Sequence, residues 1–226
     1  MQRQPNERVV IVAALGVATS ICLAFEMFRE LHFGSAGFRF LLWNLFLAWI
    51  PLVLALVIYG HYVRGGAPVG MLIPGLIWLV FLPNAPYIFT DFIHLSPTAG
   101  VPLWFDGTAL SAFAWTGALL CLVSVYLVHL AIRYWYGATQ GWLAVLAVLV
   151  FTSVGVYFGR VLRLNSWDLV VHPARVLRDV ASSFDEPWTV IRGGTATTVV
   201  ATMLAVTYVT FYAVLSLRFV RGPDER

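Results

Sequence analysis

The chain has 226 residues, of which 60% are hydrophobic and only 11% are charged, and its mean hydropathy is +0.84. An ordinary soluble domain carries about 25% charged residues, so a water-soluble fold of this length could not bury so much apolar side chain. All fourteen basic residues are arginines, they are scattered, and the net charge is only +3. This charge distribution argues against a nucleic-acid-binding protein.

Six apolar stretches are long enough to cross a bilayer, which takes roughly 20 residues each. Short polar joints separate them, except for a longer polar loop from Gly159 to Gly194. We therefore predict an all-α integral membrane protein, with residues 1–226 forming a single multi-pass domain built as a bundle of about six transmembrane helices. The predicted spans are residues 9–25, 40–59, 69–90, 108–132, 141–158 and 195–217.

An even number of spans places both termini on one side of the membrane. Seven arginines fall on that side and seven on the other, so the positive-inside rule alone does not orient the chain. Five of the seven on the far side lie in the long polar loop, where they can serve a site, and discounting them favours cytoplasmic termini. The far side also gathers the polar residues that follow spans one, three and five: Glu26, Arg29, Glu30, His32, Asp91, His94, Asp106, Arg160, Arg163, Asn165 and Asp168.

The third span ends in residues 82–91, a stretch with two prolines, an amide and a carboxylate. Proline lacks an N–H and crowds the carbonyl four residues back, so Pro83 and Pro86 would each free a carbonyl, in the second case that of Leu82. Freed carbonyls beside Asn84 can hold a cation, a water molecule or a substrate hydroxyl, as broken helices do in transporters. The alternative is a kink that neighbouring helices satisfy.

Two acid–histidine pairs raise the question of a metal. Asp91 and His94 are three residues apart and would share a face if the helix continued, and Asp168 and His172 are four apart. Two carboxylates and two imidazoles could complete a metal site, which Asp106 could join. The spacing is common by chance, however, and solvated residues at the interface are the favoured interpretation. We therefore predict no bound metal and no cofactor.

Two arginines leave the fifth span on one helical face. The planar guanidinium groups of Arg160 and Arg163 suit a carboxylate or a phosphate, so they could pair with Asp91 or Asp106, or bind a lipid headgroup or an anionic substrate. Simple interfacial anchoring together with Trp167 is the alternative. The candidate binding residues are Asn84, Tyr87, Asp91, His94, Asp106, Arg160, Arg163, Asn165, Trp167 and Asp168.

Two local features concern structure rather than chemistry. Residues 173–184 predict a short amphipathic helix that lies in the interface before the last span, with proline near its start. In the second span, Asn44 predicts an interhelical hydrogen bond.

The motif Leu82-Pro83-Asn84-Ala85-Pro86-Tyr87 is followed by Thr90-Asp91 and His94, by Trp104-Phe105-Asp106, and by Gly159-Arg160 through Asn165-Ser166-Trp167-Asp168. This combination resembles the domain of unknown function 1361 family, a group of uncharacterised bacterial multi-pass membrane proteins. The resemblance covers nearly the whole chain. It implies a small multi-pass protein of the bacterial plasma membrane and supplies no activity.

From these observations we expect a non-enzymatic membrane protein that binds or transports a small polar or anionic solute, or a lipid headgroup. Asn84 and the broken third helix would line the site, Arg160 and Arg163 would meet negative charge, and Asp91 and Asp106 would balance them. A membrane-embedded metal-dependent hydrolase or transferase acting on a lipid-like substrate is one alternative, and an accessory subunit that docks a partner is another. The expected partners are the lipid bilayer and a second copy in a homodimer, with no nucleic acid.

Overall fold

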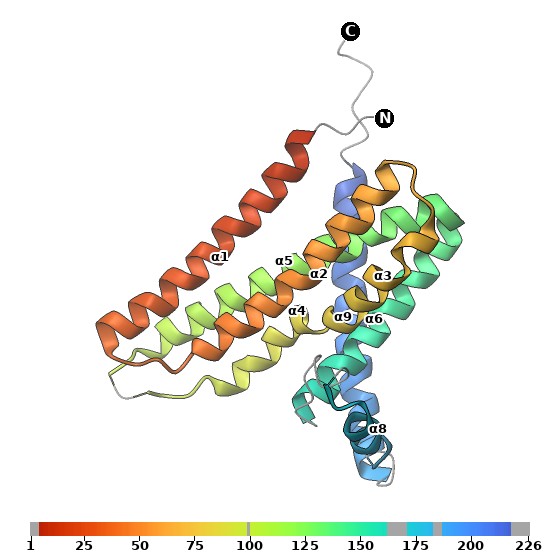
Figure 1. Cartoon of the computed structure of the whole chain (residues 1–226). Helices are drawn as coiled ribbons and strands as arrows, with labels where there is room; N and C mark the ends of the chain where they lie inside the picture. Colours follow the sequence, from red (N-terminus) through yellow and green to blue (C-terminus); the bar gives the residue numbers. More distant parts are fainter. Residues whose placement is uncertain (1–4, 99, 162–170, 183–186, 218–226) are drawn as a thin grey trace. The chain divides into compact units, whose positions relative to one another are not determined.

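A computed structural model of the chain describes residues 5–98, 100–161, 171–182 and 187–217 (Figure 1). Among these residues six helical segments are long and apolar enough to cross a membrane, as the sequence predicts. The elements are α1 (Pro5–Phe33), α2 (Arg39–Val63), η1 (Pro68–Met71), α3 (Leu72–Phe81), α4 (Asn84–Tyr87), η2 (Ile88–His94), α5 (Leu103–Tyr136), α6 (Ala138–Val161), α8 (Pro173–Ser182) and α9 (Pro187–Leu217), where η marks a 3₁₀ helix.

The helices extend beyond the predicted apolar stretches at most of their ends. The first span was expected to end at residue 25, but α1 runs on to Phe33 and carries Glu26 and Arg29 within it. A hydropathy boundary falls at the first charged residue, whereas a helix continues as long as its backbone is hydrogen-bonded and its polar side chains find partners. The short helix α8 confirms the amphipathic segment predicted before the last span.

The chain divides into two compact units, Met1–Ser124 and Val125–Arg226. The long helix α5 contributes its first part to one unit and its last part to the other. The single domain that the sequence suggests remains a prediction. The first unit contains the polar ends of four elements and is therefore the part that positions the candidate site.

The third span is a helix in three pieces, α3, α4 and η2, which Figure 1 shows as a bent path in yellow. At the break, the carbonyl of Leu82 accepts a hydrogen bond from the amide of Ala85 at 3.1 Å, and the amide of Tyr87 donates to the carbonyl of Pro83 at 3.1 Å. The side chain of Asn84 folds back, and its Nδ2 donates to the carbonyl of Phe81 at 2.8 Å. The Leu82 carbonyl is therefore not freed, contrary to expectation, because the chain tightens into a 3₁₀-type turn.

Hydrogen bonds also tie α3 and α5 to α2 in the first unit. Trp78 Nε1 donates to Ser124 Oγ at 2.7 Å, and this hydroxyl donates in turn to the carbonyl of Pro51 at 3.0 Å. All three residues are buried. In an apolar setting such interhelical bonds satisfy groups that neither water nor lipid can reach.

One close contact fixes the distance between α5 and the broken span. A Cβ placed on Gly117 would lie 2.5 Å from the carbonyl oxygen of Ala85 and 3.0 Å from Cδ1 of Ile88. Backbone atoms cannot yield as a flexible side chain can, so only glycine allows α5 to approach α4 this closely.

We predict that Gly117→Ala lowers the free energy of unfolding by about 1–3 kcal/mol, because the added methyl group forces the two backbones apart. Gly107→Ala is the matched control in the same helix, since its Cβ would meet only the end of Leu95 at an ordinary 3.8 Å. The control should be neutral or stabilising by up to about 1 kcal/mol, because alanine favours helix over glycine. Unfolding of both variants in mixed detergent micelles measures the difference, and equal effects would contradict the close-approach assignment.

Candidate functional site

Four elements of the first unit bring their ends together: the end of α1, the start of α2, η2 and the start of α5 (Figure 1). Gly34 ends α1 with φ +66°, a left-handed conformation that suits glycine, and its amide donates to the carbonyl of Glu30 at 3.1 Å. A short loop then returns the chain into α2. The buried charged side chains of this unit all lie at this end, and with Asn44 we call them the polar cluster: Glu26, Arg29, Asn44, Asp91 and Asp106.

The centre of the polar cluster is a buried ion pair between α1 and α5. Arg29 Nε donates to Asp106 Oδ1 at 2.8 Å, and Arg29 Nη2 donates to Asp106 Oδ2 at 3.0 Å. The two side chains are only 2% and 1% exposed. The remaining nitrogen, Nη1, donates to the carbonyl and the hydroxyl of Ser35 at 3.0 and 2.9 Å, and the guanidinium lies 4.3 Å from the ring centroid of Phe38. Arg29 therefore joins α1, the following loop and α5.

A second ion pair lies at the surface of the same end. Arg39, at the start of α2, donates to the carboxylate of Glu30 near the end of α1. Their side chains are 61% and 42% exposed, so water and ions screen the attraction and the pair adds little to stability.

Asp91 is the buried carboxylate closest in sequence to the helix break. It is 1% exposed in η2, and Asn44 Nδ2 of α2 donates to its Oδ2 at 2.9 Å, which confirms the interhelical hydrogen bond predicted for Asn44. Tyr87 and Thr90 are half-buried beside it, and the Thr90 hydroxyl donates to the carbonyl of Tyr87 at 2.7 Å. This hydrogen bond closes the turn that leads from the break to Asp91.

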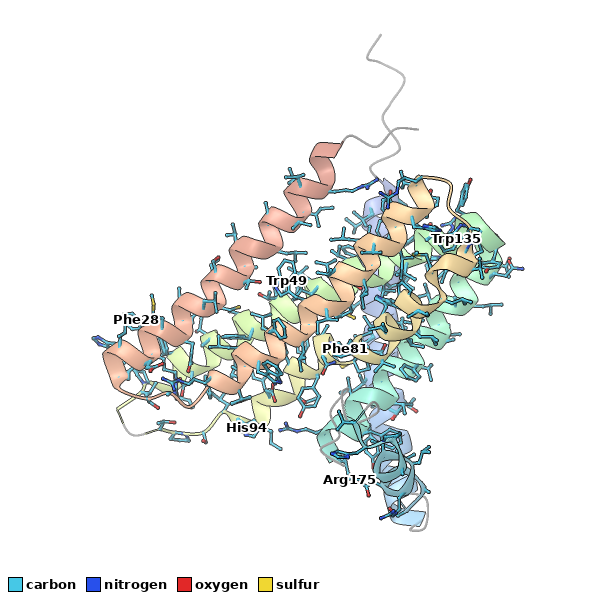
Figure 2. The ribbon with its side chains drawn as sticks, viewed as in Figure 1. Phe28, Trp49, Phe81, His94, Trp135 and Arg175 are labelled. Carbon is cyan, nitrogen blue, oxygen red and sulfur yellow. The ribbon has the colours of Figure 1, made fainter. Side chains whose placement is uncertain are left out.

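His94 does not share the environment of Asp91. It is exposed and lies at the end of the broken third span (Figure 2). Its ring meets that of Phe40 edge to face with centroids 5.3 Å apart. Asp168, from the second acid–histidine pair, lies outside the described residues, and His172 is exposed. In the part of the chain that the structure describes, no three His, Cys, Asp or Glu side chains are grouped so that they could hold a metal ion.

The other five predicted site residues come later in the chain, at the end of α6 and after it. Arg160 lies half-buried in α6 of the second unit, while Arg163, Asn165, Trp167 and Asp168 fall outside the described residues. The pairing of Asp91 with Arg160 or Arg163 therefore remains a prediction. For Asp106, the structure identifies Arg29 as the partner.

Three members of the polar cluster, Glu26, Arg29 and Asn44, were not among the predicted site residues. The sequence groups Glu26 and Arg29 with Asp106 on one predicted face but gives no signal of the pairing, because Arg29 and Asp106 are 77 residues apart. The available clue was the spacing of Cys22, Glu26 and Arg29 on one face of α1, since all three are buried.

The second unit has its own polar contacts at the end of α5. His129 Nδ1 and the hydroxyl of Tyr208 are 2.7 Å apart, and the His129 ring lies edge to face with Trp142 at 4.8 Å. Arg133 donates to the hydroxyl of Tyr212. These side chains come from α5, α6 and α9, and they pack the three helices together.

Comparison with protein families gives one match. The family model described as "Protein of unknown function (DUF1361)" matches residues 43–215, which is more than half of the chain. No curated protein and no solved structure matches significantly.

We predict that Arg29→Met and Asp106→Leu each lower the free energy of unfolding by about 3–5 kcal/mol, because each removes one partner of a buried ion pair that also holds α1 against α5. The double variant should cost less than the sum, since it buries neither charge. Glu30→Gln, which breaks the exposed pair, is the control and should change stability little. Strictly additive losses in the double variant would show that the two buried groups are not coupled.

Proposed function

Since the chain belongs to the DUF1361 family, whose description assigns no function, we propose a function from the geometry: this membrane protein binds a small polar solute at Asp91 and moves it across the membrane. The single observation that carries the proposal is a carboxylate, 1% exposed, on the 3₁₀ segment that directly follows a helix break within a membrane span. Ionisable side chains inside membrane spans are expensive and usually mark a substrate or ion pathway.

The discontinuous span supports the proposal independently of the charge. Transporters build solute sites where a membrane helix is interrupted, because local backbone and polar side chains then face a cavity. At this break, the side-chain amide of Asn84 already donates a hydrogen bond to the carbonyl of Phe81. Solute contacts are therefore assigned to Tyr87 and Asp91, with Asn44 holding the carboxylate in place.

The chemistry of the site favours a solute with hydrogen-bond donors. A carboxylate accepts hydrogen bonds from hydroxyl or ammonium groups, and the phenol of Tyr87 can donate or accept. An anionic group on the solute would instead need Arg160 and Arg163. Binding of an anionic group thus depends on one arginine in the last turn of α6 and one that follows the helix.

The proposed setting is the plasma membrane of a bacterium, with both termini in the cytoplasm. The polar cluster would then lie toward the outer face, because it sits at the ends of α1 and η2 that are reached after an odd number of crossings. This places the proposed site where a solute arrives from or leaves to the outside.

Thermal unfolding of the purified protein in detergent tests the site with a panel of small solutes: ethanolamine, choline, glycerol, glycine and inorganic phosphate. We predict that at least one donor-bearing solute raises the unfolding midpoint in a saturable way, since a ligand at ten times its Kd stabilises the folded state by about 1.4 kcal/mol. Asp91→Asn should abolish the rise, and Glu30→Gln, a carboxylate change at the same end, should keep it.

Uptake of the stabilising solute into proteoliposomes separates transport from binding. Uptake that is present in the wild type and the Glu30→Gln control, and absent in Asp91→Asn, is the expected result. A midpoint shift that survives in Asp91→Asn, or no shift with any member of the panel, would overturn the proposal.

A further inference from the structure

Glu26 is a buried charged residue that lies outside the Arg29–Asp106 ion pair. It lies on the buried face of α1, four residues after Cys22 and three before Arg29, and is only 4% exposed. Its Oε1 is buried and has no hydrogen-bond partner among the residues that the structure describes. Unsatisfied buried oxygens are rare, and an ionised one is costly.

The neighbouring guanidinium does not satisfy this oxygen. All three nitrogens of Arg29 donate elsewhere, to Asp106 and to Ser35. The other charged groups near Glu26 are Glu30 on its own helix and Arg39 on α2, and these two pair with each other at the surface. The backbone of Phe38 supplies the hydrogen bond that Glu26 does receive.

The ligand that fits such an oxygen is a proton. The atom has no exposed surface, so neither a water molecule nor a metal ion reaches it in this arrangement. A proton needs no space beyond that of the carboxyl group and removes the charge that burial penalises.

We propose that Glu26 is a proton-binding site, occupied in this arrangement, so that its side chain is a neutral carboxylic acid beside the Arg29–Asp106 pair. The proton adds to one carboxylate oxygen without any other bond being made or broken. Release of this proton leaves Glu26 as a carboxylate near Arg29, where it competes with Asp106 for the guanidinium. Proton binding at Glu26 is thereby linked to the contact between α1 and α5, whichever solute the protein carries.

Infrared spectroscopy of the purified protein at neutral pH tests the site directly, because a protonated carboxyl group absorbs at a different C=O frequency from a carboxylate. We expect a carboxylic acid band that shifts in heavy water and that is lost in Glu26→Gln. The matched control Glu30→Gln removes an exposed, ion-paired carboxylate four residues away on the same helix and should leave the band intact.

Glu26→Met provides a second neutral replacement in case the glutamine variant does not fold. Both variants should keep the unfolding midpoint of the wild type, since neither removes a charge that the folded state holds. A band of full intensity in the folded variants, or failure of both to fold, would overturn the proposal.

The acid band of Glu26 also tests the proposed link between proton binding and the Arg29–Asp106 ion pair. In Asp106→Asn the guanidinium of Arg29 loses its anionic partner and becomes available to Glu26. The acid band should then fall to the level of Glu26→Gln, as Glu26 gives up its proton to pair with Arg29. An acid band that is unchanged in folded Asp106→Asn would contradict the link while leaving the solute site at Asp91 untouched.

Discussion

An arginine whose side chain is only 2% exposed in a membrane-spanning helix needs an anionic partner and hydrogen-bond acceptors, and this requirement organises the first unit. Arg29 meets it with two hydrogen bonds to Asp106 and two to Ser35, so the end of α1, the loop after it and the start of α5 occupy fixed positions relative to one another. Once α5 is fixed, Gly117 brings it against the carbonyl of Ala85, and the broken third span is held between α2 and α5.

The polar groups at the break in the third span and those at the site that follows it have different roles. Asn84 and the backbone of residues 82–87 satisfy the break with their own hydrogen bonds. Asp91 lies beyond these hydrogen bonds in the 3₁₀ segment that follows, where Asn44 of α2 donates to it. The expected binding position moves from the break itself to the 3₁₀ turn that follows, because a group that has already paired with the backbone offers less to a solute.

Much of the fold could be predicted because lipid allows few backbone arrangements, so long apolar stretches must be helices. The hydrogen bond of Asn44 was predictable for the same reason, since a buried amide needs a partner on another helix. The pairing of Arg29 with Asp106 could not be predicted. The two residues are 77 positions apart in the sequence, and their contact depends on how α1 and α5 pack. The different fates of Asp91 and His94 depend on a 3₁₀ geometry that the continuous-helix pattern did not indicate.

An experimental structure of the protein with its stabilising solute tests the central claim most directly, namely that the carboxylate of Asp91 is a solute site supported by the Arg29–Asp106 framework. The account predicts solute density in hydrogen-bonding distance of Asp91 and Tyr87, with the Arg29–Asp106 pair intact beside it. Density that lies away from Asp91, with its hydrogen bond from Asn44 unchanged, would contradict the account and make the polar cluster a purely structural feature.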